Sequence, residues 1–227
     1  NLIKNNKILN VLEKLIGPEI MSNPVQNSRI KQPEKFLTKD LVFDGLSGRT
    51  PWHQDAGVMS VNGQKFTDLI TVWVPFTKTT KKNGCMLTIN GSHKMGLLNH
   101  DNGYKGQAQI RNSELLDKIK PVALEANIGD IVILTKHTVH CSLPNLSNNF
   151  RISMDLRYNK AGQPSGRDLL PSFYIKSKNK KNITIKNYKE WLTLWEKAKA
   201  KCLPRKYTFK YKTPTFKNNK RDLVNLI

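Results

Sequence analysis

The chain has 227 residues and a formal net charge of +21, from 38 basic and 17 acidic side chains, and 38% of its residues are hydrophobic. This length suits one ordinary domain with a single core. No apolar run approaches the roughly 20 residues that a membrane-spanning helix needs, so we expect no membrane span. The first residues do not resemble a signal peptide. The chain begins with Asn1 rather than Met, which leaves room for a missing N-terminal segment.

The basic residues and the cysteines indicate the kind of partner and the compartment. The lysines are spread along the chain among many asparagines, and no nucleic-acid recognition motif accompanies them. We therefore expect a solvated basic surface and no specific nucleic-acid partner. The same positive field favours an anionic small-molecule substrate. Cys85, Cys141 and Cys202 are odd in number and form no CxxC pair, which predicts free thiols and a cytoplasmic location.

The N-terminal half is expected to contain one helix and several short strands. Apolar residues at helical spacing predict a helix over 2–16, and Gly17-Pro18 ends it. The turn-rich stretch that follows holds one candidate strand, at 41–43. The apolar run at 68–75 predicts a buried strand, and Asn-Gly pairs bracket a shorter one at 85–89.

The C-terminal half begins with a polar stretch. Residues 96–113 are punctuated by glycines, which predicts a long surface loop, and a short helix is expected at 113–119. An apolar stripe over about 187–201 predicts a C-terminal helix. Two further strands are expected at 121–125 and 130–135.

The segment 150–158 alternates strictly between polar and apolar residues, which is typical of a strand with two different faces. Its polar face carries Arg151, Ser153, Asp155 and Arg157. Many short strands separated by turn signals and flanked by helices predict a mainly β fold, an antiparallel sandwich or barrel, in a single domain over 1–227.

Three side chains have the composition of a metal site. His53 and Asp55 are two residues apart, so on a strand they would project from one face and bind one ion together. With His140 they complete two imidazoles and one carboxylate, the ligand set that holds non-haem Fe(II) and leaves positions open for cosubstrate and oxygen. Arg151 could clamp a dicarboxylate beside that metal.

Two other functions remain open at this point. Two histidines and a carboxylate also suit catalytic zinc, which would make the protein a non-redox, cupin-like hydrolase or isomerase. A basic nucleic-acid-binding module is disfavoured because no recognition motif is present.

The order and spacing of several motifs resemble the phytanoyl-CoA dioxygenase family of Fe(II)/2-oxoglutarate oxygenases. The resemblance covers about 50–158, roughly half of the chain. The motifs are Trp52-His53-Gln54-Asp55, Leu69 to Pro75, Asn83 to Leu87, Gly91-Ser92-His93, Gly129 to Val132, His140-Cys141-Ser142, Asn145, Ser147 and Arg151.

The resemblance implies a double-stranded β-helix, a cupin-like jelly roll, with its core at about 41–158. It implies hydroxylation of an unactivated C–H bond in a small molecule or acyl ester, using O2 and 2-oxoglutarate and releasing succinate and CO2. An intact Asp55 favours hydroxylation over halogenation. The resemblance also leads us to expect that the usual N-terminal segment of the family is short or absent here. The implied site residues are His53, Asp55 and His140 for iron, Arg151 for the distal carboxylate of 2-oxoglutarate, Ser142 and Trp73 for the wall of its pocket, and Gln54 near it.

Several residues are less certain. Arg157 shares a strand face with Arg151 and is predicted to contact an anionic substrate, with a structural salt bridge to Asp155 or another acid as the alternative. Two segments, 56–66 and 96–113, are expected to act as lid loops. Cys141 is expected to point away from the metal. Of the remaining histidines, none is expected to be a ligand, and the one in the polar loop, His100, is expected to be solvated.

Overall fold

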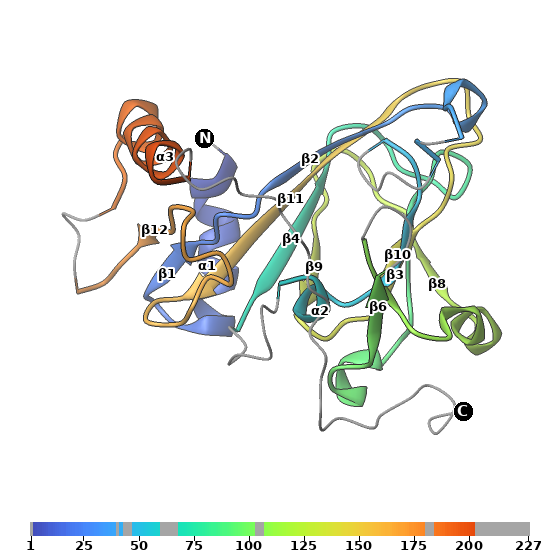
Figure 1. Cartoon of the computed structure of the whole chain (residues 1–227), viewed down its shortest axis with the longest axis horizontal. Coiled ribbons are helices and arrows are strands. Elements are labelled where there is room, and N and C mark those ends of the chain that lie inside the picture. Colours follow the sequence, from blue (N-terminus) through green and yellow to red (C-terminus); the bar gives the residue numbers. More distant parts are fainter. Residues whose placement is uncertain are drawn as a thin grey trace.

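The computed structural model describes residues 2–39, 41–42, 47–59, 68–102, 107–179 and 184–202. Within these ranges the chain forms two larger antiparallel sheets and one small hairpin (Figure 1). The first sheet runs in the order β12 (Phe173–Lys176), β1 (Ile20–Ser22), β11 (Arg151–Lys160), β4 (Ile70–Pro75), β9 (Val132–Thr135), and β2 (Asn27–Lys31) also pairs with β11.

The second sheet is smaller and supplies the opposite wall of the site. Its order is β3 (Thr50–His53), β10 (His140–Ser142), β5 (Met86–Thr88), β8 (Val122–Leu124). The hairpin pairs β6 (His100–Asn102) with β7 (Ala108–Ile110). Figure 1 shows this sheet and hairpin to the right of the long, diagonal β11 and β4. The helices are α1 (Asn6–Ile16), α2 (Asp55–Met59) and α3 (Tyr188–Cys202), with 3-10 turns at Leu2–Lys4, Glu34–Phe36, Ser92–Met95 and Ser113–Ile119.

Helix α1 covers the outer face of the first sheet. Its start is set by Asn5, whose side-chain oxygen accepts hydrogen bonds from the backbone N–H groups of Lys7 and Ile8, so a short 3-10 turn precedes the α-helix. The helix ends at Gly17, which adopts φ +86°. The apolar face of α1 packs into one buried cluster with the sheet: Ile8, Leu9, Leu12, Ile16, Ile20, Ile70, Val72, Val74, Leu156, Tyr158 and Ile175.

The central strands are buried on both faces, and this arrangement positions the site. In β4, Val72 and Val74 face α1, whereas Thr71 and Trp73 face the interior between the sheets. In β11 the odd-numbered residues from Arg151 to Arg157 are buried, as the alternating pattern predicts. The polar face of β11 is therefore enclosed by protein.

The strands expected at 68–75, 85–89, 121–125, 130–135 and 150–158 are all present with shifted ends, as are the helical turn at 113–119 and the C-terminal helix. Three expectations were wrong. The sheets begin at Ile20 rather than near residue 41, because the short strand β1 and the short, polar strand β2 are held by pairing with β11. Leu41 and Val42 form a turn, and Phe43 lies outside the described residues. Residues 96–113 are not simply a surface loop.

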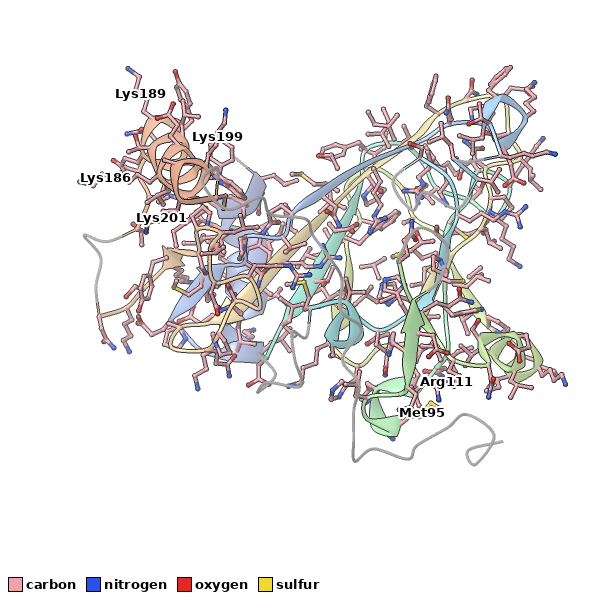
Figure 2. The ribbon with its side chains drawn as sticks, viewed as in Figure 1. Met95, Arg111, Lys186, Lys189, Lys199 and Lys201 are labelled. Atoms are coloured by element: carbon pink, nitrogen blue, oxygen red, sulfur yellow. The ribbon has the colours of Figure 1, made fainter. Side chains whose placement is uncertain are left out.

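The segment 96–113 contains the β6–β7 hairpin, and Leu98 and Ile110 are buried in a second apolar cluster. Of the expected lid at 56–66, residues 56–59 belong to the largely buried α2, and the remainder lies outside the described residues. No helix in the described part of the chain is long and apolar enough to cross a membrane. Figure 2 shows the exposed lysines Lys186, Lys189, Lys199 and Lys201 at or beside α3.

Candidate metal centre

The three predicted metal ligands converge. His53 ends β3, Asp55 begins α2, and His140 begins β10, opposite His53 in the strand register. All three side chains are buried, and their candidate ligand atoms lie within 4.8 Å of one another. The convergence was predicted for two residues on one strand. The structure achieves it instead across a strand end and the first turn of a helix.

The hydrogen bonds of both imidazoles leave the same nitrogen available to a metal. His53 Nδ1 lies 2.8 Å from the Pro51 carbonyl oxygen, and His140 Nδ1 lies 2.9 Å from that of Thr138. Because a carbonyl oxygen can only accept, each Nδ1 carries the proton and each Nε2 keeps its lone pair. Burial, together with the neighbouring His140, lowers the pKa of His53 to about 3. A neutral imidazole is the form that binds a metal.

Asp55 is held as a carboxylate by partners on both of its oxygens. Thr71 Oγ1 donates to Oδ2, and Arg157 Nη2 donates to Oδ1 at 3.1 Å. Burial alone would raise the pKa of Asp55, but Arg157, His140 and His53 together hold it below its usual range. The carboxylate is thereby charged and oriented.

Arg157 belongs to a buried chain of charges. Its guanidinium also lies 3.4 Å from Asp155 Oδ2, which Arg29 Nη2 approaches to 2.7 Å. Arg157 therefore forms the salt bridge with Asp155 that was the alternative to a substrate contact. It also pairs with Asp55, the candidate metal ligand. The residue pattern did not point to Arg29, because β2 is short and lies in a turn-rich stretch.

One pocket is lined by the two candidate histidine ligands and most of the other predicted residues. Trp73, Ser142, Arg151 and Arg157 line it with His53 and His140. Cys141 also borders the pocket, where the pairing of β10 with β3 shifts register, although it was expected to face away. The rest of the wall is formed by Arg29, Thr50, Thr71, Met86, Leu134 and Asp155.

Arg151 is buried, and not all of its N–H groups have hydrogen-bond partners. Its Nη1 donates to Ser153 Oγ and its Nη2 to the Gly84 carbonyl oxygen at 3.2 Å. Its Nε has no hydrogen-bond partner, and it has no ion-paired carboxylate among the described residues. Burial and the nearby Arg29 lower the pKa of Arg151 to about 10. A buried guanidinium in this state fits a carboxylate ligand.

Gln54 is not among the residues of the pocket wall, and its place near the cosubstrate stays a prediction. Its amide nitrogen donates to the carbonyl oxygens of Gly96 and His137, each at 2.7 Å, and its amide oxygen accepts from the Leu98 N–H. These bonds turn the side chain away from the pocket. Gln54, which lies between His53 and Asp55 in the sequence, is thus hydrogen-bonded to the residues that precede β6.

His100 was expected to be solvated and is instead 4% exposed. Its Nδ1 lies 2.9 Å from the Leu98 carbonyl oxygen, so its Nε2 accepts the hydrogen bond from the Gln54 backbone N–H at 3.1 Å. Burial lowers the pKa of His100 to about 4. A Cβ added at Gly57 would clash with this ring, which shows how closely α2 packs on it. A polar, glycine-rich stretch carries no sequence signal for such burial.

Comparison with known proteins identifies the family and the fold. The sequence profile described as phytanoyl-CoA dioxygenase (PhyH) matches residues 4–153. A phytanoyl-CoA dioxygenase domain-containing protein 1 homolog of Dictyostelium discoideum is 32% identical over 121 residues, covering 50% of this chain and 41% of that protein. A probable alpha-ketoglutarate-dependent hypophosphite dioxygenase of Stutzerimonas stutzeri is 27% identical over 153 residues, covering 65% and 48%.

The chain thus spans about half, or less, of the length of these curated relatives. Among solved structures, the non-heme monooxygenase ThoJ in its apo form matches with a TM-score of 0.57 and 19% identity, covering 89% of this chain and 75% of that one. This likeness shows the fold, the cupin-like double-stranded β-helix. The profile match extends over more than half of the sequence, and the chain belongs to the phytanoyl-CoA dioxygenase family.

Proposed function

We propose that this protein is an Fe(II)- and 2-oxoglutarate-dependent dioxygenase that hydroxylates an unactivated C–H bond of a small-molecule or acyl-ester substrate. One observation carries the proposal. His53 and His140 line a pocket together with Arg151, a buried cation with no carboxylate partner among the described residues, and the Asp55 carboxylate lies beside both histidines. The metal ligands alone would suit zinc equally well. The arginine adds a place for the second carboxylate of a keto diacid.

In this proposal each side chain has a defined task. His53 and His140 present Nε2 to the metal, and Asp55 adds one carboxylate oxygen while Thr71 and Arg157 fix its orientation. Iron supplies the oxidative chemistry, in which 2-oxoglutarate and O2 give succinate and CO2 and one oxygen atom enters the C–H bond.

Arg151 binds the distal carboxylate of the cosubstrate, and Ser142 and Trp73 line the same part of the pocket. The apolar side chains of Met86 and Leu134 form another part of the wall and limit the water that reaches the metal. The intact carboxylate of Asp55 favours hydroxylation over halogenation.

The pocket wall also supports an anionic substrate. Three arginines line it, and two of them, Arg29 and Arg157, are paired with acids. The relative from Stutzerimonas stutzeri is named for hypophosphite, which is an anion. Three cysteines without disulfides, Cys85, Cys141 and Cys202, support a cytoplasmic location. We also propose that residues 1–227 act as one oxygenase domain.

The experiment is to load the protein anaerobically with Fe(II), add 2-oxoglutarate and air, and measure succinate, including the slow turnover that occurs without substrate. Succinate formation that needs both iron and the intact His-Asp-His set supports the proposal. Absence of succinate together with tight retention of zinc would establish the zinc alternative instead.

Arg151→Ala tests the assigned role of the arginine. Loss of a charge-assisted carboxylate contact should weaken 2-oxoglutarate binding by roughly 10- to 100-fold and leave metal affinity nearly unchanged. Calorimetry with Mn(II) in place of iron measures both constants. Arg49→Ala is the matched control, because Arg49 forms a partly exposed ion pair with Glu34 that is separate from the pocket wall. Equal losses of metal and 2-oxoglutarate affinity would contradict the role.

A further inference from the structure

Lys31 is a buried cation that the proposed chemistry does not use. It is the last residue of β2, and only 1% of its surface is exposed. Its Nζ donates to Ser142 Oγ at 2.7 Å and to the Leu143 carbonyl oxygen at 2.6 Å. Among the described residues it forms no ion pair with a carboxylate. A buried ammonium group of this kind is strongly unfavourable unless an anion compensates it.

Lys31 and Arg151 converge on the same place. They are direct partners in the β2–β11 register, and both side chains are buried on the inner face of the sheet. Gly84 lies between them: its carbonyl oxygen accepts from Arg151 Nη2, and a Cβ at Gly84 would lie 2.7 Å from Lys31 Cδ. Burial, with Arg151 and then Arg29, lowers the pKa of Lys31 well below 10.5. These cations repel one another until an anion arrives.

Ser142 connects Lys31 to the pocket. Its hydroxyl oxygen accepts from Lys31 Nζ and from the Thr50 N–H at 3.0 Å, so both of its lone pairs are used. The group it can still offer is its O–H proton, and Ser142 lines the pocket whereas Lys31 lies behind it. A serine that accepts from an ammonium group is a stronger donor to a carboxylate oxygen, because such chains of hydrogen bonds polarise one another.

We propose that Lys31 is a positioning residue that, through Ser142 and beside Arg151, makes this end of the pocket select 2-oxo dicarboxylates over 2-oxo monocarboxylates. The inference rests on the proposed function, and it adds a second cation to the subsite for the distal carboxylate. A purely structural lysine, which only ties β2 to the chain after β10, would affect the binding of all 2-oxo acids alike.

The test compares two ligands that differ only at the distal end. Dissociation constants of 2-oxoglutarate and of 2-oxopentanoate are measured by anaerobic calorimetry on the full chain with Mn(II). In Lys31→Met, the constant for 2-oxoglutarate should rise by at least about 10-fold, whereas that for 2-oxopentanoate should stay within about twofold. Lys35→Met is the matched control, because Lys35 is exposed and bonds only Asn148 and the face of Phe36.

An equal change for both ligands, or no change for either, would overturn the inference while leaving the proposed function intact. Failure of the unmodified protein to bind 2-oxoglutarate would instead overturn the proposed function, and the inference with it. Lys31→Gln keeps an N–H donor toward Ser142 but removes the charge, so it serves if the methionine variant does not fold. It should also lose most of the preference for the dicarboxylate, and retention of the full preference would overturn the inference.

Discussion

The metal end of the pocket and the end formed by Arg151, with Lys31 behind it, differ in how their polar groups are paired. At the metal end, both imidazole Nδ1 atoms and both oxygens of Asp55 already have protein partners. At the other end, Arg151 Nε has no partner, and neither Arg151 nor Lys31 is ion-paired with a described carboxylate. The first region is organised before any ligand binds. The second is electrostatically complete only when an anion occupies it.

This contrast predicts which substitutions harm which ligand. The largest effect is expected for His140→Ala, which removes one of three metal ligands. Metal affinity should fall by more than the roughly 10- to 100-fold that outer-shell changes cause, and iron-dependent succinate formation should be lost. Mn(II) titration and the succinate assay measure both. His93→Ala, at an exposed histidine outside the cluster, is the control. Full metal binding without His140 would mean that the cluster is not the metal site.

The next largest effect is expected for Arg157→Met, which removes the ion pairs of Arg157 with Asp55 and Asp155 at the metal end. It leaves Asp55 and Asp155 buried with one cation fewer, so the free energy of unfolding should fall by about 3–5 kcal/mol. Urea unfolding of the metal-free protein measures it. The control is Arg49→Met, which breaks a partly exposed pair and should cost about 0–1 kcal/mol. Similar losses in the two variants would show that Arg157 is not a structural member of the metal end.

The smallest effect concerns His100, which supports the metal end through Gln54. Its pKa is lowered to about 4 in the folded state, so between about pH 6.5 and 4 the unfolded chain binds the proton more readily. The stability that neutral His100 contributes is therefore present above about pH 6.5 and is lost as the pH falls toward 4. In this pH range, His100→Gln should reduce the slope of the unfolding free energy against pH by up to the equivalent of about one bound proton.

The measurement is urea unfolding of the metal-free protein at several pH values, with the exposed His93→Gln as the control. An unchanged slope in His100→Gln would mean that His100 is not buried in its neutral form. Because glutamine can still accept from the Gln54 N–H, the substitution separates the titration of the ring from the loss of the hydrogen bond.

Much of this site was accessible from the residue pattern. The convergent residues His53, Asp55 and His140 and the buried Arg151 were singled out because the expected chemistry requires those residue types, and the strict alternation of β11 placed its charged face correctly. The hydrogen bonds of Gln54 were not predicted, because the pattern of a strand says nothing about which backbone groups a side-chain amide will reach.

By itself, the sequence determined the β-rich architecture, the candidate metal ligand set and the buried strands, because hydrophobic period and ligand chemistry are local properties. Only the tertiary structure decided that Arg29, Lys31 and His100 belong to the site or its support. Each of them lies in a short, polar segment whose burial depends on pairing with residues distant in the chain. The partners of a buried charge are set by strand register and not by the charge's own neighbours in sequence.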